Sequence, residues 1–377
     1  MVKLGIEVLL SEYKDILKGK NIGLITNPTA VDRDLNHIVD LFYNNKDINL
    51  IALYGPEHGV RGDAQAGSYV KSYIDNTTGL PVYSLYGKTK KPTSEMLKDV
   101  DLLIFDIQDV GVRFYTYIYT MAYVLEAAKE NGIEIIVLDR PNPLGGLVVE
   151  GPVLEKGYES FVGLFPIPTR HGMTIGELAN YFNEKFEING DLTVIPMKNW
   201  KRSMTYKDTG LEFVLPSPNI PTEETIYIYL GSAIFEGTNI SEGRGTTKPF
   251  QFVGAPFING RQFTQKLNSL NLPGVRFRQV SFTPSISKYQ GELCHGVEIH
   301  IINPKDFNGI NTGLYMVKTL NEMYPNNFKI TSFFDNLMGN SWVRQDILKG
   351  LSIEEIESKW EPSLNEFKDI RKKYLIY

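Results

Sequence analysis

The sequence contains a single cysteine, Cys294, among its 377 residues. One cysteine excludes an intramolecular disulfide framework and any metal cluster held only by thiolates. No stretch approaches the roughly 20 consecutive apolar residues of a membrane-spanning helix, so we expect no membrane insertion. Positive charge is not in excess either, because 39 Lys and Arg against 44 Asp and Glu give a formal net charge of −5. Since binding to phosphates needs clustered Lys and Arg, we expect no nucleic acid as a partner.

The amino-terminal segment lacks the pattern of a secretory signal peptide. Residues 1–20 hold one short apolar run, which Glu7 interrupts, and no small-residue cleavage site follows it. These features predict a cytoplasmic protein, or an exported one whose signal sequence is absent from this chain. No pattern in the sequence indicates an oligomeric state.

Apolar runs alternate with helical segments through the first 150 residues. The predicted strands lie at 21–27, 48–54, 82–86, 100–107 and 133–139, and the predicted helices at 33–45, 93–98 and 114–130. Nearly continuous apolar strands between helices are typical of a parallel sheet that is covered on both faces. We therefore expect an α/β fold class, with a Rossmann-like, doubly wound, mostly parallel sheet domain over residues 1–150.

The composition changes at about residue 151, where Pro and Gly become frequent. Thr174 and Glu177 then have the spacing of a capping box and predict a helix start. Strands are predicted at 191–196, 225–230, 275–282 and 296–302, and helices at 311–323 and 353–371. This mixture predicts a smaller α+β domain over residues 151–377.

Two nucleotide-binding motifs are missing. No G-x-G-x-x-G follows the first strand, and no G-x-x-x-x-G-K-[ST] occurs. The predicted sheet therefore does not imply NAD or ATP, and a nucleotide-dependent enzyme is the weakest alternative. The five histidines form no H-x-x-x-H or H-E-x-x-H pair, so we expect no metal and no other cofactor, although a mixed Asp/His site across loops stays open.

Polar residues gather where the predicted strands end. Ligands of a doubly wound sheet bind beyond the carboxyl ends of its strands. Four strand ends carry such residues in the first 150 positions, and three loops rich in Gly, Pro and small polar residues follow in the second half. The candidates are Glu57, His58, Arg61, Asp106, Gln108, Asp109, Arg113, Tyr115, Tyr117, Arg140 and Asn142, then His171, Ser217, Asn219, Glu236, Asn239, Glu242 and Arg244.

Each candidate has a structural interpretation beside the functional one. Glu57 and His58 form either a solvated turn or a general acid or base at a strand terminus. Asp106 and Asp109 are either bases, metal ligands or helix caps. His171 binds either an anion at a helix start or a local backbone group.

The arginines and tyrosines are equally ambiguous at this level. Arg61, Arg113, Arg140 and Arg244 suit a substrate carboxylate, but they also suit buried salt bridges. The many tyrosines near residue 117 suit packing, and some of them suit stacking on the apolar face of a sugar ring.

The order of these motifs resembles the NamZ-type exo-β-N-acetylmuramidase family, which was long a domain of unknown function. The resemblance covers essentially the whole chain. It is carried by GPEHGVRG at 55–62, DIQDVGVRFYTY at 106–117, DRPNPLGG at 139–146, RHGMTIGELA at 170–179, PSPNIP at 216–221, EGTNISEGRGTTKPF at 236–250 and a carboxyl-terminal W…F…R…YLIY.

The resemblance implies an exo-acting glycoside hydrolase that releases terminal, non-reducing β-linked N-acetylmuramic acid from peptidoglycan fragments. It implies an active-site cleft between the two domains and Glu57 as proton donor. Asp109 or Glu242 is then the second catalytic group, unless the substrate's own acetamido group is the nucleophile. The lactyl carboxylate is assigned to Arg113, Arg140 or Arg244. The predicted substrate-binding set is His58, Arg61, Asp106, Gln108, Arg113, Tyr115, Tyr117, Arg140, Asn142, His171, Ser217, Asn219, Glu236, Asn239 and Arg244.

Two other classes of function remain open at this level. A non-catalytic muropeptide-binding or sugar-binding protein needs the same arginines and aromatics but has no need for Glu57. A metal-dependent hydrolase of cell-wall amides or esters predicts His58, Asp106 and His171 as ligands. The inverting and retaining routes differ in the separation of the carboxyl groups, so both stay open.

Overall fold

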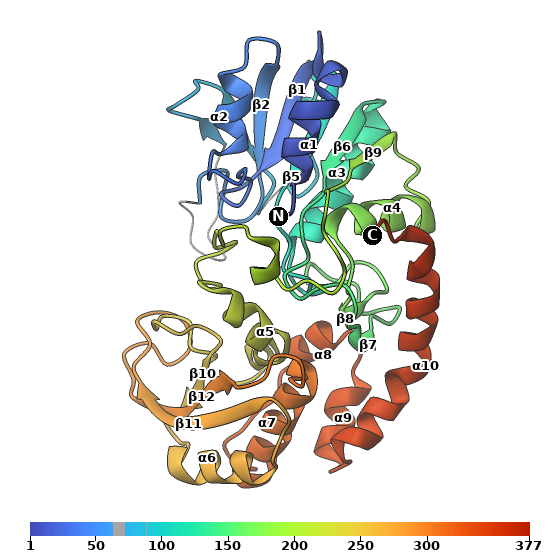
Figure 1. Cartoon of the computed structure of the whole chain (residues 1–377). Coiled ribbons are helices and arrows are strands. Elements are labelled where there is room, and N and C mark those ends of the chain that lie inside the picture. Colours follow the sequence, from blue (N-terminus) through green and yellow to red (C-terminus); the bar gives the residue numbers. More distant parts are fainter. Residues whose placement is uncertain (63–71, 88) are drawn as a thin grey trace.

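A computed structural model describes residues 1–62, 72–87 and 89–377. Its helices and strands form two units, with the amino-terminal sheet at the top of Figure 1 and a smaller sheet with helices at the bottom. We call them the first unit and the second unit. The α/β fold with a second, smaller domain is confirmed.

The first unit is built on a sheet that has seven strands within the described residues. Their order is β3-β4-β2-β1-β5-β6-β9, and all neighbours are parallel except β3 and β4. The strands are β1 (Asn21–Thr26), β2 (Asn49–Gly55), β3 (Tyr73–Ile74), β4 (Pro81–Ser84), β5 (Leu102–Asp106), β6 (Glu134–Leu138) and β9 (Leu192–Ile195).

Helices cover both faces of this sheet. Leu103 and Phe105 of β5 belong to an apolar cluster with residues of α3 (Tyr117–Asn131) and α4 (Ile175–Lys185). Leu102 and Ile104 belong to another, with α1 (Gly5–Glu12) and α2 (Ile38–Tyr43). Successive side chains of a strand point to opposite faces, which explains why the predicted strands read as continuous apolar runs.

The first unit continues past the boundary that we predicted at residue 150. β9 pairs in parallel with β6, so Val194 lies beside Val137 in the main sheet. The Pro- and Gly-rich segment after residue 150 contains a two-stranded ribbon of β7 (Glu150–Val153) and β8 (Pro168–Arg170). The change in composition therefore marks an excursion of the chain between β6 and α4. The predicted capping box of Thr174 and Glu177 is present at the start of α4.

The second unit is built on an antiparallel sheet in the order β10-β12-β11. Its strands are β10 (Phe252–Ala255), β11 (Val275–Phe282) and β12 (Cys294–Ile301). The strands predicted at 275–282 and 296–302 are therefore confirmed as β11 and β12. Its helices are α5 (Glu223–Ser232), α6 (Gly260–Ser269), α7 (Gly309–Met323), α8 (Ser332–Met338), α9 (Trp342–Leu348) and α10 (Ile353–Arg371). Short 3-10 helices are η1 (Lys14–Leu17), η2 (Lys207–Thr209), η3 (Ala233–Gly237) and η4 (Lys372–Tyr374).

The strand that we predicted at 225–230 is wrong, because this segment is part of α5. Thr222 caps the helix by accepting a hydrogen bond from the Thr225 amide, and two glutamates occupy its first turn. The alternating Ile and Tyr residues imitate the two-residue period of a strand. In the structure, α5 is buried on most sides, so a two-residue pattern does not distinguish its faces.

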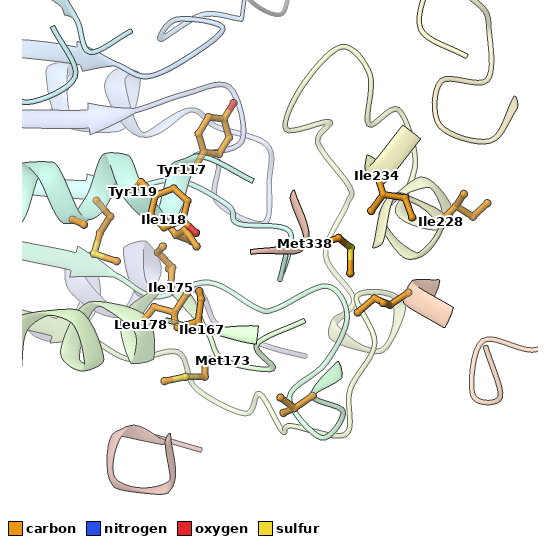
Figure 2. Close-up of a cluster of buried hydrophobic side chains, with 14 of the residues drawn as sticks. Tyr117, Ile118, Tyr119, Ile167, Met173, Ile175, Leu178, Ile228, Ile234 and Met338 are labelled. Carbon is orange, nitrogen blue, oxygen red and sulfur yellow. The ribbon is translucent and has the colours of Figure 1, made fainter. Parts of the chain in front are cut away.

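An apolar cluster joins the two units. Figure 2 shows it extending from Tyr119 and Leu178 in the first unit to Met338 and Ile234 in the second. Because apolar surface from both units is buried in one cluster, separating the units exposes it to water.

The chain also returns from the second unit to the first through α10, which runs along one side of the molecule (Figure 1). Beyond α10, the Tyr377 hydroxyl donates a hydrogen bond of 2.8 Å to Asp139 and accepts one of 2.7 Å from the Met197 amide. Its ring packs edge-on against Trp200, with 5.1 Å between the ring centres. In the described ranges, no helix combines the length and the apolar character that crossing a bilayer requires.

Candidate functional site

A cavity of about 510 Å³ lies between the two units. Residues of both units line it, from the end of β2 and the start of α3 on one side to α5, η3 and the loops near 244 and 286 on the other. The described lining residues include Glu57, His58, Tyr86, Phe114, Tyr115, Thr116, Tyr117, Phe161, Ser217, Asn219, Tyr229, Glu236, Arg244, Phe250, Ile286, Ser287, Phe333 and Leu337.

A tight turn after β2 presents Glu57 and His58 to the cavity. The Gly59 amide donates to the Pro56 carbonyl over 3.0 Å, and His58 and Gly59 have φ angles of 73° and 76°. A left-handed conformation is uncommon for a residue other than glycine and costs about 1–2 kcal/mol. The local energy of this turn is therefore raised, and the surrounding packing holds it in place.

The start of α3 supports Glu57 from one side. The Thr116 hydroxyl lies 3.5 Å from the Glu57 carboxylate, and the Tyr117 hydroxyl lies 3.4 Å from the Glu57 carbonyl oxygen. Burial together with the neighbouring Glu57 carboxylate raises the pKa of Tyr86 to about 12. Tyr86 is thus a neutral hydroxyl beside Glu57 at ordinary pH.

The second unit contributes an acid–base pair to the cavity. Arg244 Nη2 lies 3.2 Å from Glu236 Oε1, and the two side chains are 21% and 25% exposed. Arg244 Nε lies 3.3 Å from Glu242, whose side chain is only 2% exposed. Burial raises the pKa of Glu236, although the nearby Arg244 charge opposes that shift. Glu236 and Arg244 therefore face the cavity, and Glu242 lies behind them.

Lys288 fixes Glu242 in that position. Its ammonium lies 3.0 Å from the Glu242 carboxylate and donates to the carbonyl oxygens of Phe235 and Ile240 over 2.7 and 3.1 Å. Lys288 and Arg244 together balance the charges of Glu236 and Glu242. The pair that faces the cavity is thus held from behind by a second pair.

Aromatic rings form much of the remaining cavity wall. Tyr115 packs edge-on against Tyr117 at 5.0 Å, and Tyr229 packs edge-on against Phe250 at 4.7 Å. Burial raises the pKa of Tyr115 and of Tyr229 well above the usual range, so both hydroxyls remain neutral. Rings beside a few polar groups suit a ligand that has apolar faces and a hydroxyl rim, such as a sugar.

Two of the predicted arginines form salt bridges away from the described cavity lining. Arg61 pairs with Asp40 at 3.1 Å and with Asp75 at 3.2 Å. Arg140 grips Asp106 through two nitrogens, and the Nη2 contact measures 2.9 Å. Arg61, Arg140 and Asp106 are not among the described residues that line the cavity.

Arg113 is buried and joins three parts of the chain. It donates to the carbonyl oxygens of Pro152, Ile167 and Leu337 over 2.5, 3.0 and 2.8 Å. Burial lowers its pKa to about 10. The structure therefore places this predicted substrate ligand between the units as a buried donor to backbone carbonyls.

The remaining predicted residues of the strand ends bind one another or the backbone. Asp109 accepts a hydrogen bond from the Gly111 amide over 2.7 Å and faces His171 Nε2 at 3.4 Å, and both side chains are buried. The Gln108 amide donates to the carbonyl oxygens of Asp109 and Pro141. None of these side chains is among the described residues that line the cavity.

Two predicted asparagines also serve as local connectors. Asn142 donates to the Met173 carbonyl over 2.9 Å, and Asn239 donates to the Asn327 carbonyl over 2.8 Å. By contrast, Glu57, His58, Tyr115, Tyr117, Ser217, Asn219, Glu236 and Arg244 all line the cavity.

Several lining residues were missed from the sequence. They are Tyr86, Phe114, Thr116, Phe161, Val162, Ile220, Tyr229, Phe250, Ile286, Ser287, Phe333 and Leu337. Tyr229 was hidden because its segment was read as a strand. Phe250 stands inside the 236–250 motif and was available to inspection, whereas nothing near residues 286, 287 or 333 pointed to a site.

The described residues contain no group of three or more His, Cys, Asp and Glu side chains that is arranged to hold a metal ion. His58, Asp106 and His171, the ligands expected for a metal-dependent hydrolase, do not form such a group. Asp106 is paired with Arg140, and His171 faces Asp109.

Comparisons with known proteins agree along the whole chain. Two family models match it, "Exo-beta-N-acetylmuramidase NamZ, N-terminal" over residues 22–224 and "Exo-beta-N-acetylmuramidase NamZ, C-terminal" over residues 227–377. Peptidoglycan beta-N-acetylmuramidase NamZ of Bacillus subtilis (strain 168) is 61% identical over 378 residues, which cover 100% of this chain and 91% of that protein.

Two solved structures are also similar, both DUF1343 family proteins of Bacteroides fragilis NCTC 9343. One is 41% identical with a TM-score of 0.91, and the other is 36% identical with a TM-score of 0.83. Each comparison covers 100% of this chain and 99% of the solved chain.

Proposed function

The chain belongs to the exo-β-N-acetylmuramidase NamZ family, and we propose that Glu57 is the proton donor of its reaction. The activity is that of a glycoside hydrolase, which releases terminal, non-reducing β-linked N-acetylmuramic acid from peptidoglycan fragments. The observation that carries the role of Glu57 is its presence in one cavity with the Glu236–Arg244 pair of the other unit.

Cleavage of a glycosidic bond requires a carboxyl group that gives its proton to the departing oxygen. Glu57 is half-buried, lines the cavity and has the Thr116 hydroxyl beside its carboxyl group. The neutral Tyr86 hydroxyl also lies beside Glu57. Its place in the lining of the cavity supports this role of Glu57.

The second carboxylate of the reaction is Glu236 in this proposal. Asp109 and Glu242, which we had predicted, are not among the described lining residues, whereas Glu236 is. Glu236 belongs to the second unit and Glu57 to the first, so the two carboxyl groups reach a sugar in the cavity from different units. There it activates water or orients the 2-acetamido group of the substrate, the two ways in which a second group completes the displacement.

Arg244 binds the lactyl carboxylate of the muramic acid residue. It is the arginine among the described residues of the cavity lining. Its contacts to Glu236 and Glu242 use Nη2 and Nε, and a guanidinium has five N–H donors. N–H groups of Arg244 therefore remain for a substrate carboxylate, and this contact separates N-acetylmuramic acid from N-acetylglucosamine.

The proton donor is tested with two leaving groups. Replacing Glu57→Gln should lower kcat/KM on a 4-methylumbelliferyl β-N-acetylmuraminide by roughly 10²–10⁴-fold, the usual contribution of general acid catalysis. A 2,4-dinitrophenyl muraminide should lose much less, because dinitrophenolate departs without a proton. Glu95→Gln, an exposed position of the first unit, is the matched control and should leave both rates unchanged.

Other outcomes contradict the proposal in distinct ways. Equal losses on both substrates exclude Glu57 as the proton donor, and near-normal turnover of Glu57→Gln excludes any catalytic role for it. Binding of the muraminide without cleavage by the unmodified protein indicates a binding protein instead. Loss of activity with a chelator indicates metal-dependent chemistry, and equal cleavage of the matching β-N-acetylglucosaminide contradicts the role of Arg244.

A further inference from the structure

A second hollow adjoins the cavity at the surface of the second unit, with a volume of about 970 Å³. We call it the outer groove, and its described lining includes Asn219, Thr246, Phe252, Phe282, Thr283 and Ile286. Asn219 and Ile286 also line the cavity that holds Glu57. The groove and the cavity therefore adjoin at these two residues.

The outer groove differs from the cavity in its chemistry. The described residues of its lining include no Asp, Glu, Lys, Arg or His, whereas the cavity is lined by Glu57, Glu236 and Arg244. Hydroxyl and amide side chains alternate there with apolar ones, and the rings of Phe252 and Phe282 pack at 5.5 Å. Ile286 is 49% exposed, so part of its apolar surface is accessible in the groove.

Two loops that bind each other build the walls of the outer groove. The Ser285 amide and hydroxyl both donate to the Gly245 carbonyl oxygen over 2.9 Å. Gly245 has a φ of 78°, and a Cβ there would lie 2.6 Å from the Ile286 nitrogen, so the backbones meet as closely as glycine permits. The groove is thus formed before a ligand arrives.

We propose that the outer groove binds the leaving-group saccharide, the neutral N-acetylhexosamine next to the cleaved bond and the glycan that continues from it. This inference rests on the proposed function. An exo-acting enzyme holds the terminal sugar in its cavity, so the rest of the glycan continues outside the cavity, and the outer groove adjoins the cavity at Asn219 and Ile286. A pyranose ring has apolar faces and a hydroxyl rim, which match apolar side chains among hydroxyl and amide groups.

The absence of charge in the described lining of the outer groove favours a glycan over a peptide stem as its occupant. A peptide stem of peptidoglycan carries carboxylates and amines, and burying these without partners of opposite charge is costly. An N-acetylhexosamine has no ionised group and forms hydrogen bonds through hydroxyl and acetamido groups. Asn219 and Thr246 supply side chains that donate and accept such bonds.

The test fills the groove without touching the cavity. Thr283 and Thr247 are exposed, line the groove and are absent from the cavity lining. Thr283→Trp and Thr247→Trp should each lower kcat/KM on an unsubstituted muramyl tetrasaccharide by 10-fold or more. Cleavage of N-acetylmuramyl β-fluoride, whose leaving group is one atom, should change by less than 3-fold. Gln290→Trp, exposed in the loop that carries Thr283 but outside the groove, is the matched control.

The outcomes separate the two proposals. If the unmodified protein does not cleave the fluoride, the proposed function fails and the groove proposal with it. If the fluoride is cleaved but both Trp variants process the tetrasaccharide normally, the groove proposal alone is overturned. The same applies if both substrates slow equally, or if only a peptide-bearing tetrasaccharide slows.

Discussion

Two carboxylate–arginine pairs of this molecule are alike in the groups they join and opposite in setting. Asp106 and Arg140 lie at the ends of β5 and β6, with side chains 0% and 4% exposed. Glu236 and Arg244 lie in the second unit, 25% and 21% exposed, and line the cavity. One pair is enclosed by the protein, and the other is open on one side.

The two pairs also differ in how completely their groups are used. Arg140 grips both oxygens of Asp106 and donates additionally to the Val31 carbonyl over 3.0 Å. Arg244 gives Glu236 a single contact of 3.2 Å, and its own charge is shared with Glu242. A buried pair that satisfies itself supports the fold, whereas a partly exposed pair with unused donors can receive a ligand.

The largest expected effect comes from breaking the enclosed pair. Asp106→Ala leaves the Arg140 charge buried without its partner, so we expect the free energy of unfolding to fall by about 3–5 kcal/mol. Urea unfolding followed by fluorescence measures this, and kcat/KM of the folded fraction should stay within about 3-fold.

The double variant Asp106→Leu with Arg140→Met is the matched control for that experiment. Removing both charges avoids the uncompensated one, so the double variant should be more stable than Asp106→Ala alone. A stability loss below 1 kcal/mol for Asp106→Ala, with a large loss of turnover, would instead assign the pair to the reaction.

The open pair should show the reverse pattern. Arg244→Met should lower kcat/KM on the muraminide by about 10–100-fold, because a hydrogen bond to a charged group contributes about 1.5–3 kcal/mol. The preference over the matching glucosaminide should disappear, and stability should fall less than in Asp106→Ala. Arg276→Met, an exposed arginine on β11, should change neither quantity. A preserved preference for the muraminide would contradict the assignment of Arg244.

The smallest expected effect is on stability and concerns Asp139, a buried acid that has no arginine partner among the described ion pairs. Burial raises its pKa to about 7, so its contribution to stability is full below about pH 3.8 and is lost as the pH rises through about 7. The hydrogen bond from Tyr377 opposes this loss, because it favours the ionised form. Tyr377→Phe should therefore lower the free energy of unfolding by about 1 kcal/mol, and more at pH 8 than at pH 5.

Urea titrations at the two pH values measure this difference. In an Asp139→Asn background the carboxylate is gone, so the effect of Tyr377→Phe should no longer depend on pH. An equal loss at both pH values in the unmodified background would show that Tyr377 acts only through its packing and the Met197 amide.

Local signals predicted much of the fold. β11 was predicted at 275–282 and α10 at 353–371, which are their bounds in the structure. Strand alternation in β11 and the capping box of Ser352 in α10 act within a few residues, so they are readable in one sequence. α5 was misread because its burial on most sides erased the helical period.

Long-range pairing limited the prediction of the site. Arg140 binds Asp106, 34 positions away, and Arg113 binds the Leu337 carbonyl, 224 positions away. Whether an arginine is free for a ligand depends on such partners, and the sequence does not list them. Glu57 and the motif that contains Glu236 and Arg244 were found because their loops are rich in residues with little role in packing.

The contact between Tyr377 and Asp139 has a consequence for how the protein is made. The two residues are separated by 238 positions in the chain. A ribosome that adds about 5–20 residues per second needs roughly 12–48 s to extend the chain from one to the other. During that interval the nascent sheet contains Asp139 without this donor. We therefore expect the first unit to depend most on chaperones before its late-synthesised partner emerges.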